Sequence, residues 1–139
     1  MPDLVITAGP YRFTGRLETE KAPLTCAAFL DMLPLKENLL HVRWSGESTW
    51  VPLGERSVAV PPENPTTYPL PGEVLLYPGG VSEAEILIPY GRTQFGSKAG
   101  LLAGNHFMTI VSGAEHLADL GRLTLWEGAQ PIMLDRFDD

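Results

Sequence analysis

Glycine and proline interrupt this chain so often that no apolar run grows long. Fourteen glycines and thirteen prolines are spread over 139 residues, mostly between apolar runs. Glycine permits positive φ, and proline fixes φ and lacks an N–H, so both favour turns over long regular elements. The pattern predicts many short strands joined by tight turns, and the length fits one domain, 1–139, with one core.

Alternating apolar and polar residues identify most of the strands. In Tyr11 to Leu17, Tyr11, Phe13 and Leu17 share one face while Arg12, Thr14 and Arg16 share the other. The stretches interpreted as strands are 4–8, 11–17, 38–44, 48–53, 73–77, 83–90, 106–111, 123–126 and 132–137. The proline-rich stretch 55–70 predicts a rigid extended connection between two of them.

Two short helices are expected between these strands. Cys26, Phe29, Leu30 and Leu33 recur at helical spacing after Pro23, and Pro34 should end that helix. Ser112 and Glu115 have the spacing of a capping box, which predicts a second helix ending at Leu120 with Gly121 just beyond it. About eight to ten strands and two helices favour a closed barrel or a sandwich, and closure leaves no exposed sheet edge.

Charge and composition argue against several kinds of partner. The formal net charge is −7 and the ten Lys and Arg residues are dispersed, so nucleic-acid binding is not expected. No apolar run approaches the roughly 18–20 residues that span a bilayer, and the N-terminus lacks a signal-peptide pattern. We therefore expect a cytoplasmic protein. Its one cysteine, Cys26, cannot form an intrachain disulfide and is expected to be a buried thiol.

No metal or cofactor is expected from the motifs. The three histidines, His41, His106 and His116, lack ligand spacing, and there is no cysteine pair. No Gly-x-Ser-x-Gly nucleophile motif occurs, and the glycine-rich stretches match no phosphate-binding fingerprint.

Several motifs resemble known families. The stretch GRLETEKAPLTCAAFL is similar to the opening of a cyclophilin, through Gly15, Arg16, Leu17, Ala22, Pro23, Thr25 and Phe29. The stretches SGESTWVPL, PENPTTYPLPGEVLLYPGG, FGSKAGLLAGNHF and LWEGAQPI resemble DUF3830, a prokaryotic family of uncharacterised proteins with a cyclophilin-like fold. This resemblance implies a mainly β fold, a closed cyclophilin-like antiparallel β-barrel of about eight strands with two short helices.

The cyclophilin resemblance also implies one candidate activity, peptidyl-prolyl isomerisation. Cyclophilins carry a catalytic Arg in a Phe-His-Arg stretch after the first helix, whereas this chain reads LLHVRWSG, with Arg43 in the comparable place. The Phe-Met-x-Gln-Gly-Gly-Asp run that follows in cyclophilins is absent. Peptide binding or residual isomerase activity through Arg43, Trp44 and Trp50 is therefore one hypothesis.

Leu70 to Phe107 supports a different hypothesis, the binding of a small polar molecule at the barrel edge. Polar and aromatic residues lie near strand ends there: an Arg to anchor an anion, a His at a barrel mouth and aromatic rings as pocket walls. Each also has a structural interpretation, as a core ring, a solvated Arg, a turn Asn or a backbone-bonded His. The candidate ligand-binding residues of this hypothesis are Tyr77, Tyr90, Arg92, Phe95, Asn105 and His106, and those of the peptide hypothesis are Arg43 and Trp44.

A third hypothesis is a homo-oligomeric interaction module without catalysis. Exposed tryptophans and the proline-rich segment would then form the interface between copies. The sequence assigns no catalytic residue under any of the three hypotheses.

Overall fold

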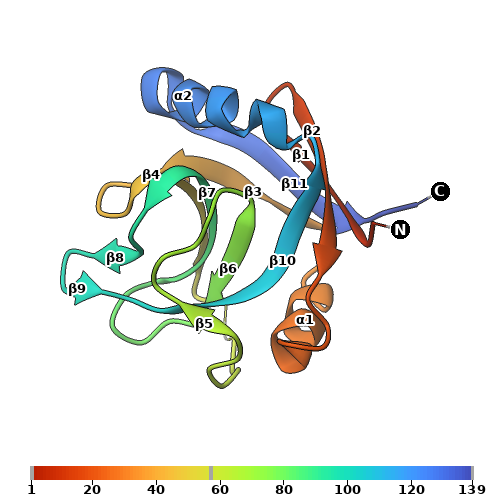
Figure 1. Ribbon diagram of the computed structural model, residues 1–139, viewed down its shortest axis with the longest axis vertical. Helices are drawn as coiled ribbons and strands as arrows, with labels where there is room; N and C mark the ends of the chain where they lie inside the picture. The colour runs from red at the N-terminus through yellow and green to blue at the C-terminus, as the bar shows by residue number, and fades with distance from the viewer. Residues whose placement is uncertain (1, 57, 139) are drawn as a thin grey trace.

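Eight antiparallel strands close into a barrel in the computed structural model, which describes residues 2–56 and 58–138 (Figure 1). In ring order they are β2 (Tyr11–Leu17), β1 (Leu4–Ala8), β11 (Gln130–Arg136), β3 (Leu35–His41), β4 (Gly46–Gly54), β7 (Ala84–Thr93), β6 (Glu73–Tyr77) and β10 (Gly104–Ser112). Pairing of β10 with β2 closes the ring. The predicted closed, mainly β barrel is confirmed, and closure protects the edges of the sheet.

The part of the chain that the structure describes has three further strands, each of two residues, outside the barrel ring. β5 (Pro65–Thr66), in the proline-rich stretch, adds to β10. β8 (Gly96–Ser97) and β9 (Gly100–Leu101) pair with each other as a small hairpin outside the barrel sheet.

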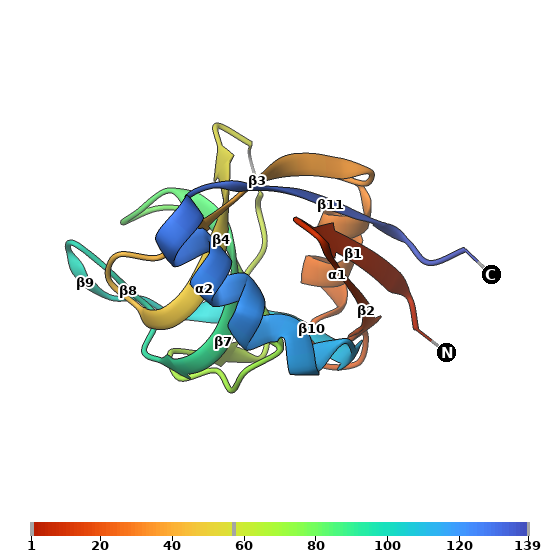
Figure 2. The ribbon, with the colours of Figure 1, turned by 90° about the horizontal axis from the view of Figure 1, so that it is seen from above.

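Among the described residues, two α-helices lie at opposite ends of the molecule (Figure 1). α1 (Pro23–Leu30) begins at Pro23, as predicted, and buries Cys26 and Phe29. Its Phe29 ring lies 4.9 Å from the ring of Phe107 on β10, centre to centre. α2 (Leu117–Glu127) follows the 3₁₀ turn η1 (Ala114–His116) and lies across β3, β4 and β7, as Figure 2 shows from above.

The start and end of the second helix were predicted wrongly. Ser112 does not cap it, because its hydroxyl hydrogen-bonds with the Thr14 hydroxyl on β2. The helix continues through Gly121 to Glu127, so the expected strand at 123–126 is helical. Gly128, at φ +89°, follows the helix where Gly121 was expected to. The β3 prediction was shifted, since the strand starts directly after Pro34.

Apolar side chains of β7 face two separate cores. Ala84, Ile86 and Ile88 point into the main core inside the barrel. Leu87 points the other way, into a second cluster with Leu75, Tyr77, Phe95 and Leu102. Two-sided burial explains the nearly continuous apolar run of β7, because the segment around β8 and β9 covers its outer face. No helix among the described residues is long and apolar enough to cross a membrane.

Candidate functional site

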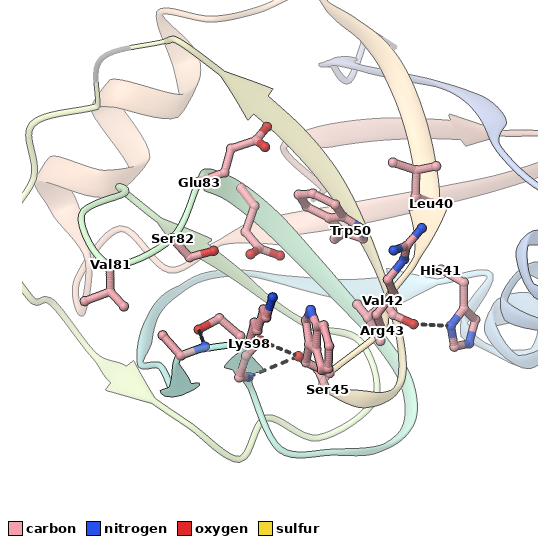
Figure 3. A pocket seen from close by; sticks show the side chains of 15 residues that line it. Leu40, His41, Val42, Arg43, Ser45, Trp50, Val81, Ser82, Glu83 and Lys98 are labelled. Atoms are coloured by element: carbon pink, nitrogen blue, oxygen red, sulfur yellow. Dashed lines mark hydrogen bonds between the residues drawn. The ribbon is translucent and has the colours of Figure 1, made fainter.

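A cavity of about 490 Å³ lies on the outer face of the sheet, beside the second cluster (Figure 3). Three chain connections form its walls: the β3–β4 turn, the β6–β7 turn and the β8–β9 hairpin. Its lining residues are Leu40, His41, Val42, Arg43, Trp44, Ser45, Trp50, Val81, Ser82, Glu83, Glu85, Gly96, Ser97, Lys98 and Ala99. The site is therefore built by turns on a rigid sheet, an arrangement typical of binding sites.

Hydrogen bonds hold these three walls in place. The Ser45 side chain accepts a hydrogen bond from the Gly96 N–H at 3.0 Å and donates to the Gly96 carbonyl at 3.2 Å. It thereby joins the β3–β4 turn to β8. The Tyr77 hydroxyl accepts from the N–H groups of Val81 at 3.1 Å and Ser82 at 3.4 Å, which fixes the β6–β7 turn.

Glu85 is the one buried carboxyl in the lining, with 7% of its surface exposed. Burial raises its pKa to about 8, and the nearby charge of Glu83 adds to the increase. Glu83 itself accepts a hydrogen bond from the Gly54 N–H at 3.0 Å. Because the pKa of Glu85 lies above neutrality, its carboxyl holds a proton at pH 7 and can donate a hydrogen bond into the cavity.

Two cationic side chains lie at the cavity without an anionic partner. Arg43 and Lys98 are exposed and line it, and neither takes part in the ion pairs formed among residues 2–56 and 58–138. Trp44 and Trp50 also line it, with Trp44 58% exposed. Figure 3 shows Trp50 and Lys98 directed toward the same space. The cavity thus combines free positive charge, indole surface and a protonated acid.

The predicted site residues are divided between this cavity and other places. Arg43 and Trp44 line the cavity. Tyr77 and Phe95 belong to the second cluster beneath it, with their rings edge to face at 5.7 Å. These two rings therefore support the cavity from below.

Tyr90 and Arg92 lie toward the other end of β7. The Tyr90 hydroxyl is 2.7 Å from Nε2 of His41, whose Nδ1 is 2.8 Å from the Val42 carbonyl. Since a carbonyl only accepts, Nδ1 carries the proton, and in the neutral ring Nε2 accepts from Tyr90. Burial, and then the charge of Glu47, raise the pKa of Tyr90. Arg92 is exposed and does not line the cavity.

Asn105 fastens the proline-rich segment to the barrel. Only 4% of it is exposed. It accepts a hydrogen bond from the Glu63 N–H at 3.1 Å and donates to the Thr25 hydroxyl at 3.0 Å and the Pro61 carbonyl at 2.9 Å. Glu63 in turn accepts from the N–H groups of Leu24 and Thr25 at the start of α1. Asn105 therefore joins three parts of the chain and is not a cavity residue.

His106 belongs to a separate polar chain on the barrel surface. Its Nε2 donates to the Thr109 hydroxyl at 2.8 Å, and that hydroxyl donates to Glu18 at 2.8 Å. Burial by itself raises the pKa of Glu18, but hydrogen bonds from Thr109 and Arg16 outweigh it and lower the pKa. His106 does not line the cavity.

Sequence reasoning missed Glu85 and Lys98. In an ordinary half-exposed strand, the acids of EAEILIPY would face solvent. In the structure Glu85 is buried, and the segment after β7 returns over the same face, where Phe95 and Leu102 pack with Leu87. Phe95 and Leu102 were a usable signal, since apolar residues in a glycine-rich loop need a surface to cover. The described residues contain no group of three His, Cys, Asp or Glu side chains placed to hold a metal ion.

The chain belongs to the family described as "Protein of unknown function (DUF3830)", which it matches over residues 4–136. It is similar in structure to McbB, solved in complex with tryptophan, with a TM-score of 0.74 and 17% identity. That match covers 98% of this chain but only 45% of McbB. A hypothetical protein, AF2241 from Archaeoglobus fulgidus, matches with a TM-score of 0.65 and 21% identity over 98% of this chain and 95% of its own. No curated protein matches the sequence.

Proposed function

Because membership of a family of unknown function assigns no activity, we propose a function from the cavity: the protein binds a small molecule that has a planar apolar body and a carboxylate. The observation that carries this proposal is that two cations, which form no ion pair within residues 2–56 and 58–138, lie with indole surface at one cavity. The size of the cavity, about 490 Å³, falls within the usual range for small-molecule sites.

The two cations supply the recognition of an anion. Arg43 offers a planar fork of N–H donors that matches a carboxylate, and Lys98 approaches from the β8–β9 hairpin. Glu83 accepts a hydrogen bond from the Gly54 N–H, and Glu85 is protonated at neutral pH. Within residues 2–56 and 58–138 neither acid forms an ion pair with Arg43 or Lys98, so both cations are available to a ligand carboxylate.

The two tryptophans supply the recognition of a planar group. Trp50 lies partly buried against the second cluster, which restricts the motion of its ring. Trp44 extends from the β3–β4 turn with more than half of its surface exposed. A flat ligand placed against these rings would cover apolar surface that is now open to water.

The similarity to McbB adds modest support. That protein was solved with tryptophan bound, and tryptophan has both a planar ring and a carboxylate. At 17% identity the similarity concerns the fold alone. Tryptophan therefore serves here as a probe of the cavity.

The test compares three probes that share an indole ring and differ in charge. Tryptophan carries a carboxylate and an amine, indole-3-propionate only the carboxylate, and tryptamine only the amine. We expect the first two to raise the melting temperature and to give saturable heats in calorimetry, and tryptamine to do neither. Equal binding of all three, or of none, contradicts the proposal.

Two Arg→Ala variants provide the matched comparison. Arg43→Ala removes a cation that lines the cavity, whereas Arg92→Ala removes an exposed cation outside it. We expect Arg43→Ala to weaken binding of indole-3-propionate by about 10-fold, which is the loss of one charge-assisted contact. Arg92→Ala should leave the affinity unchanged.

Prolyl isomerisation is the second candidate, and one observation favours it. Arg43, Trp44 and Trp50 line a single cavity, so a donor and an apolar surface lie together. Isomerisation of an X–Pro bond needs little more than these two elements. A protease-coupled assay on a proline peptide tests it: a rate equal to background, unchanged by Arg43→Ala, eliminates this candidate.

A further inference from the structure

We infer that the Glu85 carboxyl exchanges a proton with the molecule held in this cavity, so that the cavity is an acid–base active site for planar ligands and not only a binding site. The inference rests on the proposed function, because it needs a ligand in that cavity.

Glu85 and Trp50 lie on the same face of three paired strands, β4, β7 and β6. Glu85 is opposite Pro52 on β4 and Tyr77 on β6, while Leu87, two residues along, is opposite Trp50 and Leu75. Residues two apart on a strand share a face, so Trp50 and Glu85 are diagonal neighbours. A flat molecule against Trp50 would therefore lie next to the carboxyl.

The carboxyl is buried but faces the cavity. Burial of Glu85 and the charge of Glu83 are the only causes of its raised pKa, with no hydrogen bond from the described residues contributing. Glu85 nevertheless lines the cavity, so its side chain borders the space that a ligand would occupy. A polar group in such a position is free to bond with a ligand.

The charged and titratable groups around Glu85 are Glu83 on its own turn, His41 and Arg43 from the β3 end, Lys98 from the β8–β9 hairpin and Tyr77 opposite it on β6. On β4 the residue opposite Glu85 is Pro52 and its diagonal neighbour is Trp50, and neither side chain titrates. His41 uses both ring nitrogens in hydrogen bonds. Arg43 and Lys98 are exposed, so solvent weakens their effect on the carboxyl.

Such a carboxyl suits proton transfer near neutral pH. General acid–base catalysis is most effective when the pKa of the group lies close to the working pH. The pKa of Glu85, about 8, leaves both its acid and its base forms populated there. A carboxylate formed in this desolvated place is also a stronger base than one in water.

A planar probe can measure this base directly. In 5-nitrobenzisoxazole, the carboxylate of Glu85 would take the proton from the ring carbon beside nitrogen. The electrons of that C–H bond form the nitrile, the N–O bond breaks, and the oxygen leaves as a coloured phenolate. The proton on Glu85 then returns to water, so the reaction needs no oxidant, metal or second substrate.

We expect the intact protein to release phenolate at a rate that rises with pH, with a midpoint near pH 8, after subtraction of the hydroxide reaction. The rate in Glu85→Gln should be lower by about 100-fold, a typical contribution of a positioned general base. Glu83→Gln removes the neighbouring negative charge, so the midpoint should move to lower pH. Glu20→Gln, an exposed acid in the turn before α1, should retain the full rate.

Two outcomes overturn the inference: equal rates in the intact protein and Glu85→Gln, or a rate without a midpoint between about pH 6 and about pH 9. Binding of indole-3-propionate is measured on the same samples. If binding persists while Glu85→Gln leaves the rate unchanged, the inferred role of Glu85 in proton transfer is wrong and the proposed binding function stands. If both are missing, the proposed function fails as well.

Discussion

The hydroxyl of Tyr77 holds the backbone N–H of Val81 at 3.1 Å, so a ring of the second cluster fixes one wall of the cavity. The Tyr77 ring is 8% exposed and lies edge to face with Phe95. The β6–β7 turn and the second cluster are thus joined through one side chain, that of Tyr77.

Tyr77→Phe should loosen this wall while leaving the cluster filled. The ring keeps its apolar contacts, but the β6–β7 turn loses the acceptor for Val81 and Ser82. We expect a loss of about 1 kcal/mol in the free energy of unfolding, measured by urea denaturation. Hydrogen exchange at these two amides should be faster. If the exchange rates of these two amides do not change, the turn is held by contacts other than the Tyr77 hydroxyl.

Glu85 should make the protein less stable as pH rises. In the unfolded chain Glu85 ionises near its ordinary pKa of about 4.5, whereas the folded protein holds the proton up to about pH 8. Between these values the folded state binds more protons than the unfolded state. The free energy of unfolding therefore falls with increasing pH across this window, by several kcal/mol in total from this one group.

Glu85→Gln isolates this effect, because the amide is similar in size and does not ionise. At about pH 5 the variant and the parent protein should have similar stability, and at about pH 8 the variant should be the more stable by ~3 kcal/mol. Urea denaturation at a series of pH values measures the difference. A constant difference across the series contradicts the raised pKa.

The barrel could be predicted from the sequence because its determinants are local. Glycine and proline mark the turns, alternation marks the strands, and Pro23 marks the start of α1. The bounds of the second helix were predicted wrongly because they were also taken from local signals, at Ser112 and Gly121. Tertiary contacts override both signals. Ser112 bonds with Thr14, a residue 98 positions away.

The cavity could be predicted only in part. Arg43 and Trp44 were identified because LLHVRWSG lies where cyclophilins carry their catalytic Arg. The place of Glu85 in the cavity depends on the return of residues 91–104 over the outer face of β7. This return produces no periodic pattern in the sequence. Asn105 and His106 have the residue types of a site, but their side chains bond within the protein. Residue type alone does not distinguish a ligand contact from an internal one.

Asn105 and His106 should affect stability and not binding. Asn105→Ala removes three hydrogen bonds in a buried place, so we expect a loss of about 3 kcal/mol in the free energy of unfolding. His106→Ala, on a partly exposed surface, should cost about 1 kcal/mol or less. Calorimetry should give both variants the parent affinity for indole-3-propionate, at a temperature where each is folded. A loss of affinity in His106→Ala would show that His106 contributes to ligand binding, as the sequence predicted.

Gly121 allows α2 to lie directly on the ring of Tyr90. Because of this contact, we expect Gly121→Ala to lower the stability of the protein, whereas helix propensity alone would predict an increase. In an ordinary helix, Gly→Ala stabilises by about 1 kcal/mol. Here an added Cβ would lie 2.3 Å from ring carbons of Tyr90, well inside any real contact. We therefore expect Gly121→Ala to destabilise the protein by about 2 kcal/mol, measured by thermal or urea unfolding.

A double-mutant cycle with Tyr90→Ala separates the clash from the helix. Once the ring is removed, the added methyl group has space, and Gly121→Ala should become neutral or stabilising. The coupling between the two substitutions should thus be at least about 2 kcal/mol. Equal effects of Gly121→Ala with and without the Tyr90 ring would show that α2 does not lie against it. His41, which bonds the Tyr90 hydroxyl, lines the cavity, so the same cycle followed by probe binding tests whether the position of α2 reaches that site.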